Sequence, residues 1–335
     1  MGEFLRKYWF VCLIALAMVG ILVYYVADLN KDNVSAKSVD GQDVVASTTL
    51  GDVTSQQIYD RYQSFNQTLL YNLYRNAVVD QSIEADSTLK DQAKTMEKAI
   101  EANMDSDASG KTRFSITSEL AGYGFEGENA LHDYCITALK TRALTRQYIA
   151  DYFDEMKDVL TTNPRLVSIT TIALDSTEMS DADKEKQASI DEALSNGTTF
   201  AEIATAYSDD ATTAANKGFF GYLDSTSSAL PSEVVQAALA LDKDGTSDWL
   251  TVTDSQSGAV TMYLVHVDET DLKTIFEYDN DEVKEAVLSA FMQADQSLEA
   301  KMVKENAAKL EITFNDTDVQ KKVEDEINKS LKEGE

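Results

Sequence analysis

The sequence predicts an α+β protein in which a small antiparallel sheet with surrounding helices is inserted between segments of an all-α domain, behind one N-terminal transmembrane helix. Three observations predict this fold class. Residues 8–27 contain no charge, apolar residues recur at helical spacing before residue 160 and after about residue 270, and β-branched stretches mark the part between them. The predicted segments are 1–27, 28–163, 164–269 and 270–335.

The uncharged run of 20 residues is about 30 Å long as a helix, which matches the hydrocarbon core of a bilayer. Arg6 and Lys7 precede the run, and Asp28 and Asp32 follow it. By the positive-inside rule, the rest of the chain is exported. We therefore expect a single-pass anchor in the cell membrane with most of the chain on the extracytoplasmic side. The alternative is a signal peptide that is cleaved near residues 34–36.

The composition excludes several classes of function. The chain has 335 residues, and 58 acidic against 29 basic side chains give a formal net charge of -29. A surface this acidic repels phosphate backbones, so we expect no nucleic-acid partner. Two His and two Cys are too few for a zinc cluster or a disulfide framework. We expect no metal and no organic cofactor.

The segment before residue 160 is predicted to be helical. Thr54 and Gln57 have the spacing of a capping box, and apolar residues then recur at three- and four-residue intervals. Asn163 precedes Pro164 and ends the helical part, because a residue before proline disfavours helical geometry. The expected helices are one from 54, one over about 80–104, one over about 115–122 and one over about 127–160.

After Pro164 the residue pattern changes and predicts short strands and helices. Residues 167–174, VSITTIAL, are rich in β-branched side chains and predict a strand. Further strands are expected at 250–253 and 261–267, with helices at 181–195 and 200–207. After about residue 270 the helical spacing returns, and a charged tail follows from Asp318. We expect the returning helices to pack on the earlier ones, since their apolar stripe needs a partner.

The stretch 165–269 resembles the parvulin-type peptidyl-prolyl isomerases, on a succession of local patterns in the right order. Residues 167–174 resemble the family's opening strand, and 196–204, NGTTFAEIA, resemble its G-x-x-F-x-x-L-A pattern. The family's later patterns are matched by YSDD at 207–210, KGFFGY at 217–222, the helix from Leu230, GTS at 245–247 and the strand MYLVHV at 262–267. The wider layout is similar to that of the extracytoplasmic foldases of the PrsA and SurA group.

This resemblance implies an apolar groove that binds an X-Pro segment beside two His on adjacent strands and a nearby Cys or Asp. At these positions the chain has Thr171 and Tyr263 in place of the His pair, and Asp210. The implied proline pocket consists of Phe220, Leu230 and Val234. His266 lies three positions after the second His position, so it is expected on the other face of the sheet.

The resemblance also implies a membrane-anchored foldase or chaperone that assists the folding of secreted polypeptides. Because the His pair is replaced, two readings stay open. One is an isomerase with residual activity, in which Thr171 and Tyr263 hydrogen-bond each other. The other is a non-catalytic peptide-binding chaperone, or a scaffold of one secretion or envelope complex. The expected partners are unfolded or newly secreted polypeptides, with basic or apolar segments preferred by the acidic surface.

Overall fold

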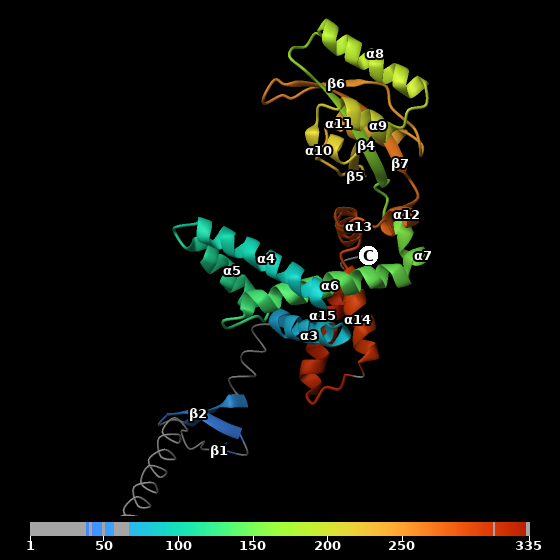
Figure 1. Ribbon diagram of the computed structural model, residues 1–335. Coiled ribbons are helices and arrows are strands. Elements are labelled where there is room, and N and C mark those ends of the chain that lie inside the picture. The colour runs from blue at the N-terminus through green and yellow to red at the C-terminus, as the bar shows by residue number, and fades with distance from the viewer. Residues whose placement is uncertain (1–37, 40–41, 49–50, 57–66, 311, 333–335) are drawn as a thin grey trace, which may run out of the picture. The chain divides into compact units, whose positions relative to one another are not determined.

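The computed structural model describes residues 38–39, 42–48, 51–56, 67–310 and 312–332 (Figure 1). The predicted anchor at 8–27 lies outside these ranges. Of the helix expected from residue 54, only residues 54–56 are described before the gap at 57–66. Within the described ranges, no helix combines the length and apolar character needed to cross a membrane. The chain divides after Leu70 into two compact units.

The first unit contains a small antiparallel sheet in the order β1-β2-β3. Its strands are β1 (Ser38–Val39), β2 (Gln42–Thr48) and β3 (Gly51–Thr54). The sequence analysis expected only helices in the segment 28–163, the first of them from residue 54, and did not predict these strands. β2 contains the pair Val44 and Val45 among Ser and Thr residues, which suits a pleated strand better than a helix.

The second unit contains long helices on both sides of the sheet segment in the sequence. Before it come α3 (Gln67–Ser82), α4 (Ser87–Ser106), α5 (Lys111–Gly122), α6 (Ala130–Asp151), α7 (Phe153–Met156) and a 3₁₀ turn over Lys157–Val159. After it come α12 (Leu272–Phe276), α13 (Asp281–Ala294), α14 (Leu298–Lys309) and α15 (Thr317–Lys332). Residues predicted as a charged tail thus form the amphipathic helix α15, which buries Val323 and Ile327.

One core joins helices from before and after the sheet segment. It contains Val78 and Val79 of α3, Leu144 of α6, and Met302 and Val303 of α14. Each of these side chains is at most 4% exposed. Burial on this scale stabilises a packed helix by roughly 1.5–3 kcal/mol for each large apolar side chain.

The four-stranded antiparallel sheet has the order β5-β4-β7-β6, which confirms the predicted α+β class (Figure 1). Its strands are β4 (Arg165–Leu174), β5 (Phe219–Leu223), β6 (Leu250–Thr253) and β7 (Val260–Glu269). β4 and β7 pair along nearly their full length, from Leu166 opposite Glu269 to Leu174 opposite Val260.

Helices cover both faces of this sheet. α11 (Ser232–Ala240) packs through Val234 and Ala238 against one face. α8 (Asp181–Ser195) and α9 (Phe200–Tyr207) pack through Ile190 and Ile203 against the other. α8 and α9 each begin with a capping box, at Ser180 and Thr199, whose reciprocal hydrogen bonds satisfy otherwise unpaired N–H groups. The short helix α10 (Ala211–Ala215) follows α9.

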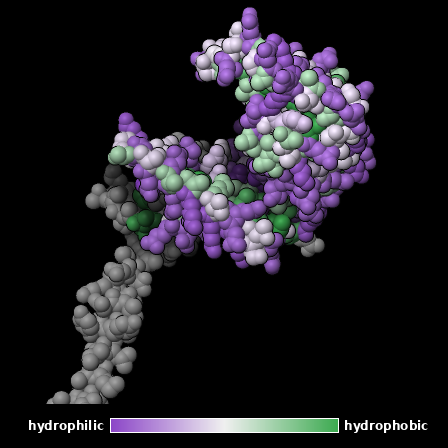
Figure 2. Space-filling model, turned by 45° about the horizontal axis from the view of Figure 1, so that its top comes forward, coloured by the Kyte–Doolittle hydropathy of each residue, from purple (hydrophilic) through white to green (hydrophobic). Residues whose placement is uncertain are grey.

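The surface is mainly hydrophilic on the face drawn in Figure 2, and its hydrophobic residues form small separate groups. This agrees with a chain in which 26% of the residues are charged. A binding surface on this face must therefore be sought in local hollows rather than in one broad apolar area.

Candidate functional site

The strand pair β4–β7 places Thr171 directly opposite Tyr263. Side chains that face each other across an antiparallel pair share one face of the sheet. Tyr263 packs at the edge of the apolar cluster of Val167, Val265 and α11. The two residues at the family's His positions therefore lie side by side on the α11 face of the sheet.

Thr171 is held by the loop between α9 and α10. Its N–H donates to Ser208 Oγ at 3.1 Å, and its carbonyl accepts from the N–H of Asp209 at 3.0 Å. Its Oγ1 accepts from the N–H of Asp210 at 3.0 Å. β5 pairs with β4 only as far as Ser168, so this loop satisfies the backbone groups of β4 that no strand reaches.

The hydrogen bond expected between the Thr171 and Tyr263 side chains is absent from this site, whose residues are all described. The Thr171 hydroxyl instead accepts a hydrogen bond from the N–H of Asp210. Ser208 Oγ lies a further 3.4 Å from Thr171 Oγ1. Sequence reasoning did not single out Ser208, although it belongs to the Tyr-Ser-Asp-Asp pattern that was used for the resemblance.

Tyr263 has a raised pKa. Burial is the largest cause, the negative charges of Asp210 and Asp254 raise the pKa further, and the Thr261 hydroxyl opposes the shift. The phenol therefore stays protonated at neutral pH and can donate a hydrogen bond. The N–H of Asp210 binds Thr171, which lies opposite Tyr263, so the three predicted polar residues lie near one another.

Asp210 has a structural role as the N-cap of α10. Its Oδ1 accepts from the N–H of Thr212 at 3.0 Å, and its Oδ2 accepts from Thr213 Oγ1 at 2.9 Å. These bonds fix the carboxylate next to the β4–β7 pair. Removing the side chain would therefore change both the helix start and the local charge.

The predicted proline-pocket residues lie in the same apolar cluster as Tyr263. Phe220 is half-buried and Leu230 is 9% exposed, whereas Val234 is fully buried at 0%. Of the three predicted residues, only Phe220 therefore offers appreciable surface to a ligand.

Both histidines lie outside this site. His266 stacks on Phe200 of α9 at 5.1 Å between ring centroids, and its Nδ1 is 2.9 Å from Thr246 Oγ1. It is thus on the opposite face of the sheet, as expected. His132 of α6 pairs with Glu97 of α4 at 2.9 Å. Among the described residues, no group of His, Cys, Asp and Glu is arranged to hold a metal ion.

Comparison with known proteins agrees with this geometry. Residues 166–266 match the family described as Rotamase, the PPIC-type PPIASE domain. The foldase protein PrsA of Streptococcus agalactiae serotype III (strain NEM316) is 26% identical over 287 residues, which cover 84% of this chain and 86% of that protein. PrsA of Streptococcus pneumoniae (strain Hungary19A-6) is 32% identical over 119 residues, or 36% of each chain. The crystal structure of PrsA from Bacillus subtilis aligns with a TM-score of 0.40 and 18% identity, covering 84% of this chain and 98% of that one.

Residues 166–266 are therefore a parvulin-type domain, and the four-stranded sheet described above forms its centre. The chain as a whole is PrsA-like, since its similarity to a foldase of that name extends well beyond this domain.

Proposed function

We propose that this protein is an extracytoplasmic foldase whose parvulin-type domain binds prolyl segments of newly secreted polypeptides. The proposed cleft has Thr171, Asp210 and Tyr263 as its polar side and Phe220, Leu230 and Val234 as its apolar side. The observation that best supports it is the direct pairing of Thr171 with Tyr263 beside an apolar cluster. The Tyr263 phenol is a donor for the carbonyl oxygen of a bound prolyl peptide.

Without an imidazole at either strand position, we propose that the domain binds more than it catalyses. The barrier to prolyl isomerisation falls only if the site favours the twisted amide over the planar one. The Thr171 hydroxyl already accepts from the N–H of Asp210, so one of its two acceptor positions is occupied. The absence of an imidazole at both positions also favours the second candidate function, a non-catalytic chaperone or scaffold of one secretion or envelope complex.

A refolding assay separates these candidates. We expect the purified protein to suppress aggregation of an unfolded client while accelerating proline-limited refolding only slightly. Tyr263→Phe should weaken binding of a prolyl peptide several-fold by removing the donor. Rapid catalysis that Thr171→Ala and Tyr263→Phe both abolish would establish the isomerase instead. Absence of both activities would contradict the foldase proposal.

Asp210→Asn tests the charge of this residue apart from its structural role. Asparagine caps a helix about as well as aspartate, so α10 should keep its start. A loss of peptide binding with unchanged unfolding would assign a role to the carboxylate charge. Asp210→Ala, which removes the cap as well, is the matched comparison.

We also propose that the protein is anchored in the membrane by residues 8–27 and prefers basic or apolar client segments. The net charge of -29 supports the basic preference. Attraction of this kind is screened within about 10 Å at 0.1 M salt. Capture of a basic client should therefore slow steeply between 0.05 and roughly 0.5 M salt, and an unchanged rate would exclude the charge preference.

A further inference from the structure

A second hollow lies among the helices, away from the parvulin-type domain. It is a cavity of about 310 Å³ between α3, α4, the loop after α5, α6, α13 and α14, and we refer to it as the arginine–aromatic pocket. Its lining includes Arg75, Tyr123, Phe125, Tyr134, Ala138 and Arg142. Pockets for small molecules usually measure about 300–1,000 Å³, so this one suits a single side chain better than a cofactor.

One wall of the pocket is aromatic. Phe125 meets Tyr134 edge to face at 5.7 Å, and Tyr123 lies 6.2 Å from Tyr134. Met96 and Met292 also line the cavity, and thioethers adapt to side chains of different shapes. Because Tyr123 is 43% exposed, this wall is open to solvent.

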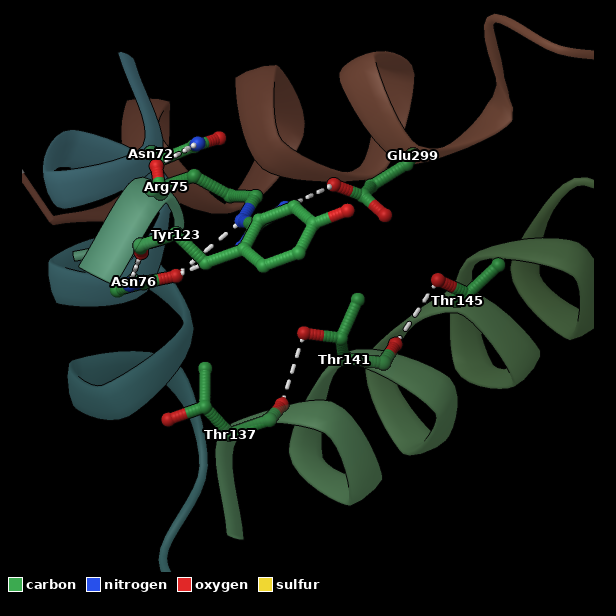
Figure 3. Close-up of polar contacts among 9 residues, drawn as sticks. Asn72, Arg75, Asn76, Tyr123, Thr137, Thr141, Thr145 and Glu299 are labelled. Carbon is green, nitrogen blue, oxygen red and sulfur yellow. Dashed lines mark hydrogen bonds and ion pairs between the residues drawn. The ribbon is translucent and has the colours of Figure 1, made fainter. Parts of the chain in front are cut away.

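The loop that holds the aromatic wall is fixed by the neighbouring helix α3. Asn72 Nδ2 donates to the carbonyl of Gly122 at 3.0 Å, and Asn76 Nδ2 donates to that of Tyr123 at 2.8 Å (Figure 3). Gly124 has φ +88°, a left-handed conformation that favours glycine, and a Cβ there would also have to displace the end of the Leu73 side chain. A wall held in this way loses little conformational freedom when a ligand binds.

The polar groups of the pocket are mainly donors. Arg75 uses three of its five N–H groups, two on Asn76 Oδ1 and one on Glu299 at 3.1 Å, among the described residues (Figure 3). Arg142 binds Glu285 and Ser289 through Nη2 alone. The hydroxyl of Thr141 donates to the carbonyl of Thr137 at 2.8 Å and can only accept from a ligand. The Glu299 carboxylate also lines the pocket and can only accept. An occupant that fits therefore offers acceptors to the two arginines and donors to Glu299 and Thr141, beside an apolar group, as an extended polypeptide backbone does.

We propose that the arginine–aromatic pocket binds one bulky apolar side chain, of leucine or phenylalanine size, from an extended polypeptide whose backbone carbonyl oxygens accept from Arg75 and Arg142. This inference rests on the proposed function, because an unfolded client displays such segments. It adds an anchoring site that does not require proline and that is separate from the parvulin-type cleft.

Labelled proline-free peptides test this proposal on the full-length protein. Three nine-residue peptides of Gly, Ser and Gln differ only in a central Phe, Leu or Ala, and fluorescence anisotropy measures their Kd. We expect the Phe and Leu peptides to bind on the order of tenfold more tightly than the Ala peptide, from the apolar area that they bury. Equal affinity for all three would overturn the proposal.

Two variants locate the binding. Ala138→Trp fills the cavity and should abolish the preference for Phe over Ala, whereas Phe114→Ala, at a 75% exposed residue outside the pocket, should keep it. If Ala138→Trp fails to fold, Arg142→Gln serves instead and should weaken all three peptides several-fold. Unchanged binding in the folded variant would overturn this site.

If the wild-type protein does not suppress the aggregation of an unfolded client, the proposed function as a whole is contradicted. Intact client protection without any side-chain preference would refute only the arginine–aromatic pocket.

Discussion

Two glycines of the parvulin-type domain differ only in what surrounds them. Gly218 has φ +86°, and a Cβ there would lie 2.7 Å from the Cβ of Ala204. Gly197 has φ +81° with nothing within 4 Å of that position. Both positions therefore favour glycine for its backbone, but only Gly218 also requires it for packing.

Alanine at these two positions should separate the two effects. Gly197→Ala should lower the free energy of unfolding by about 1–2 kcal/mol through the left-handed backbone alone. Gly218→Ala should cost about 1–3 kcal/mol more, because the core around Ala204 must move. Urea unfolding followed by circular dichroism measures both. Equal losses would show that the core yields without strain.

Tyr71 of α3 links stability to alkaline pH. Burial, followed by the negative charge of Glu299, raises its pKa from 10.0 to about 12. A group whose pKa is raised in the folded state contributes stability that is fully present below pH 10 and is lost as pH rises towards 12. The loss should be about 2–3 kcal/mol.

Tyr71→Phe should remove this part of the alkaline destabilisation. The free energy of unfolding of the variant should fall less steeply than that of the wild type between pH 10 and 12. Measurements across this range, with pH 7 as reference, are sufficient. Parallel curves for the two proteins would contradict the assignment of this loss to Tyr71.

At the scale of elements, the cap of α9 offers a matched pair of threonines. Thr199 Oγ1 accepts from the N–H of Glu202 and donates to its carboxylate at 2.7 Å. Thr205, within the same helix, only donates to the carbonyl of Ala201. Thr199→Ala should cost about 1 kcal/mol of unfolding free energy, and Thr205→Ala should change it by less than about 0.5 kcal/mol. Similar losses would mean that α9 is fixed by packing alone.

Capping chemistry also explains which elements sequence reasoning could find. The helices at 181–195 and 200–207 were predicted with the bounds observed for α8 and α9, because both start at a local hydrogen-bonding signal and a glycine turn separates them. The helix predicted over 127–160 is broken after Asp151, where Tyr152 takes a non-helical conformation and packs against Tyr148 at 4.7 Å. Nothing local in the sequence marks that break.

One strand of the sheet, β5, was not predicted. It is five residues long and contains Gly221, so only its pairing with β4 defines it as a strand. For the site, the expectation that Thr171 and Tyr263 lie on adjacent strands followed from the family resemblance. The use of the Thr171 hydroxyl by Asp210 did not, because it depends on how the α9–α10 loop closes over β4.

At the scale of the whole molecule, the last helix, α15, packs on α14, which belongs to the helical core. Val323, at 2% exposure, faces α14 and α3, whereas Lys321 is exposed. Val323→Asp should destabilise the helical part by more than about 2 kcal/mol, because an unpaired charge would be buried. Lys321→Asp places the same side chain on the same helix and should be nearly neutral. Chemical unfolding compares them, and equal effects would show that α15 packs loosely.

The parvulin-type domain begins and ends on neighbouring strands, since Leu166 of β4 is opposite Glu269 of β7. Opposed Cα atoms in such a pair are about 4.5–5.5 Å apart. Immediately outside this pair, Leu160 and Phe276 belong to one core with Ile149 and Phe291. A gene segment encoding the domain can therefore be lost or exchanged at a single joint during evolution, at the cost of the contacts that Leu166, Phe219 and Tyr222 make with this core.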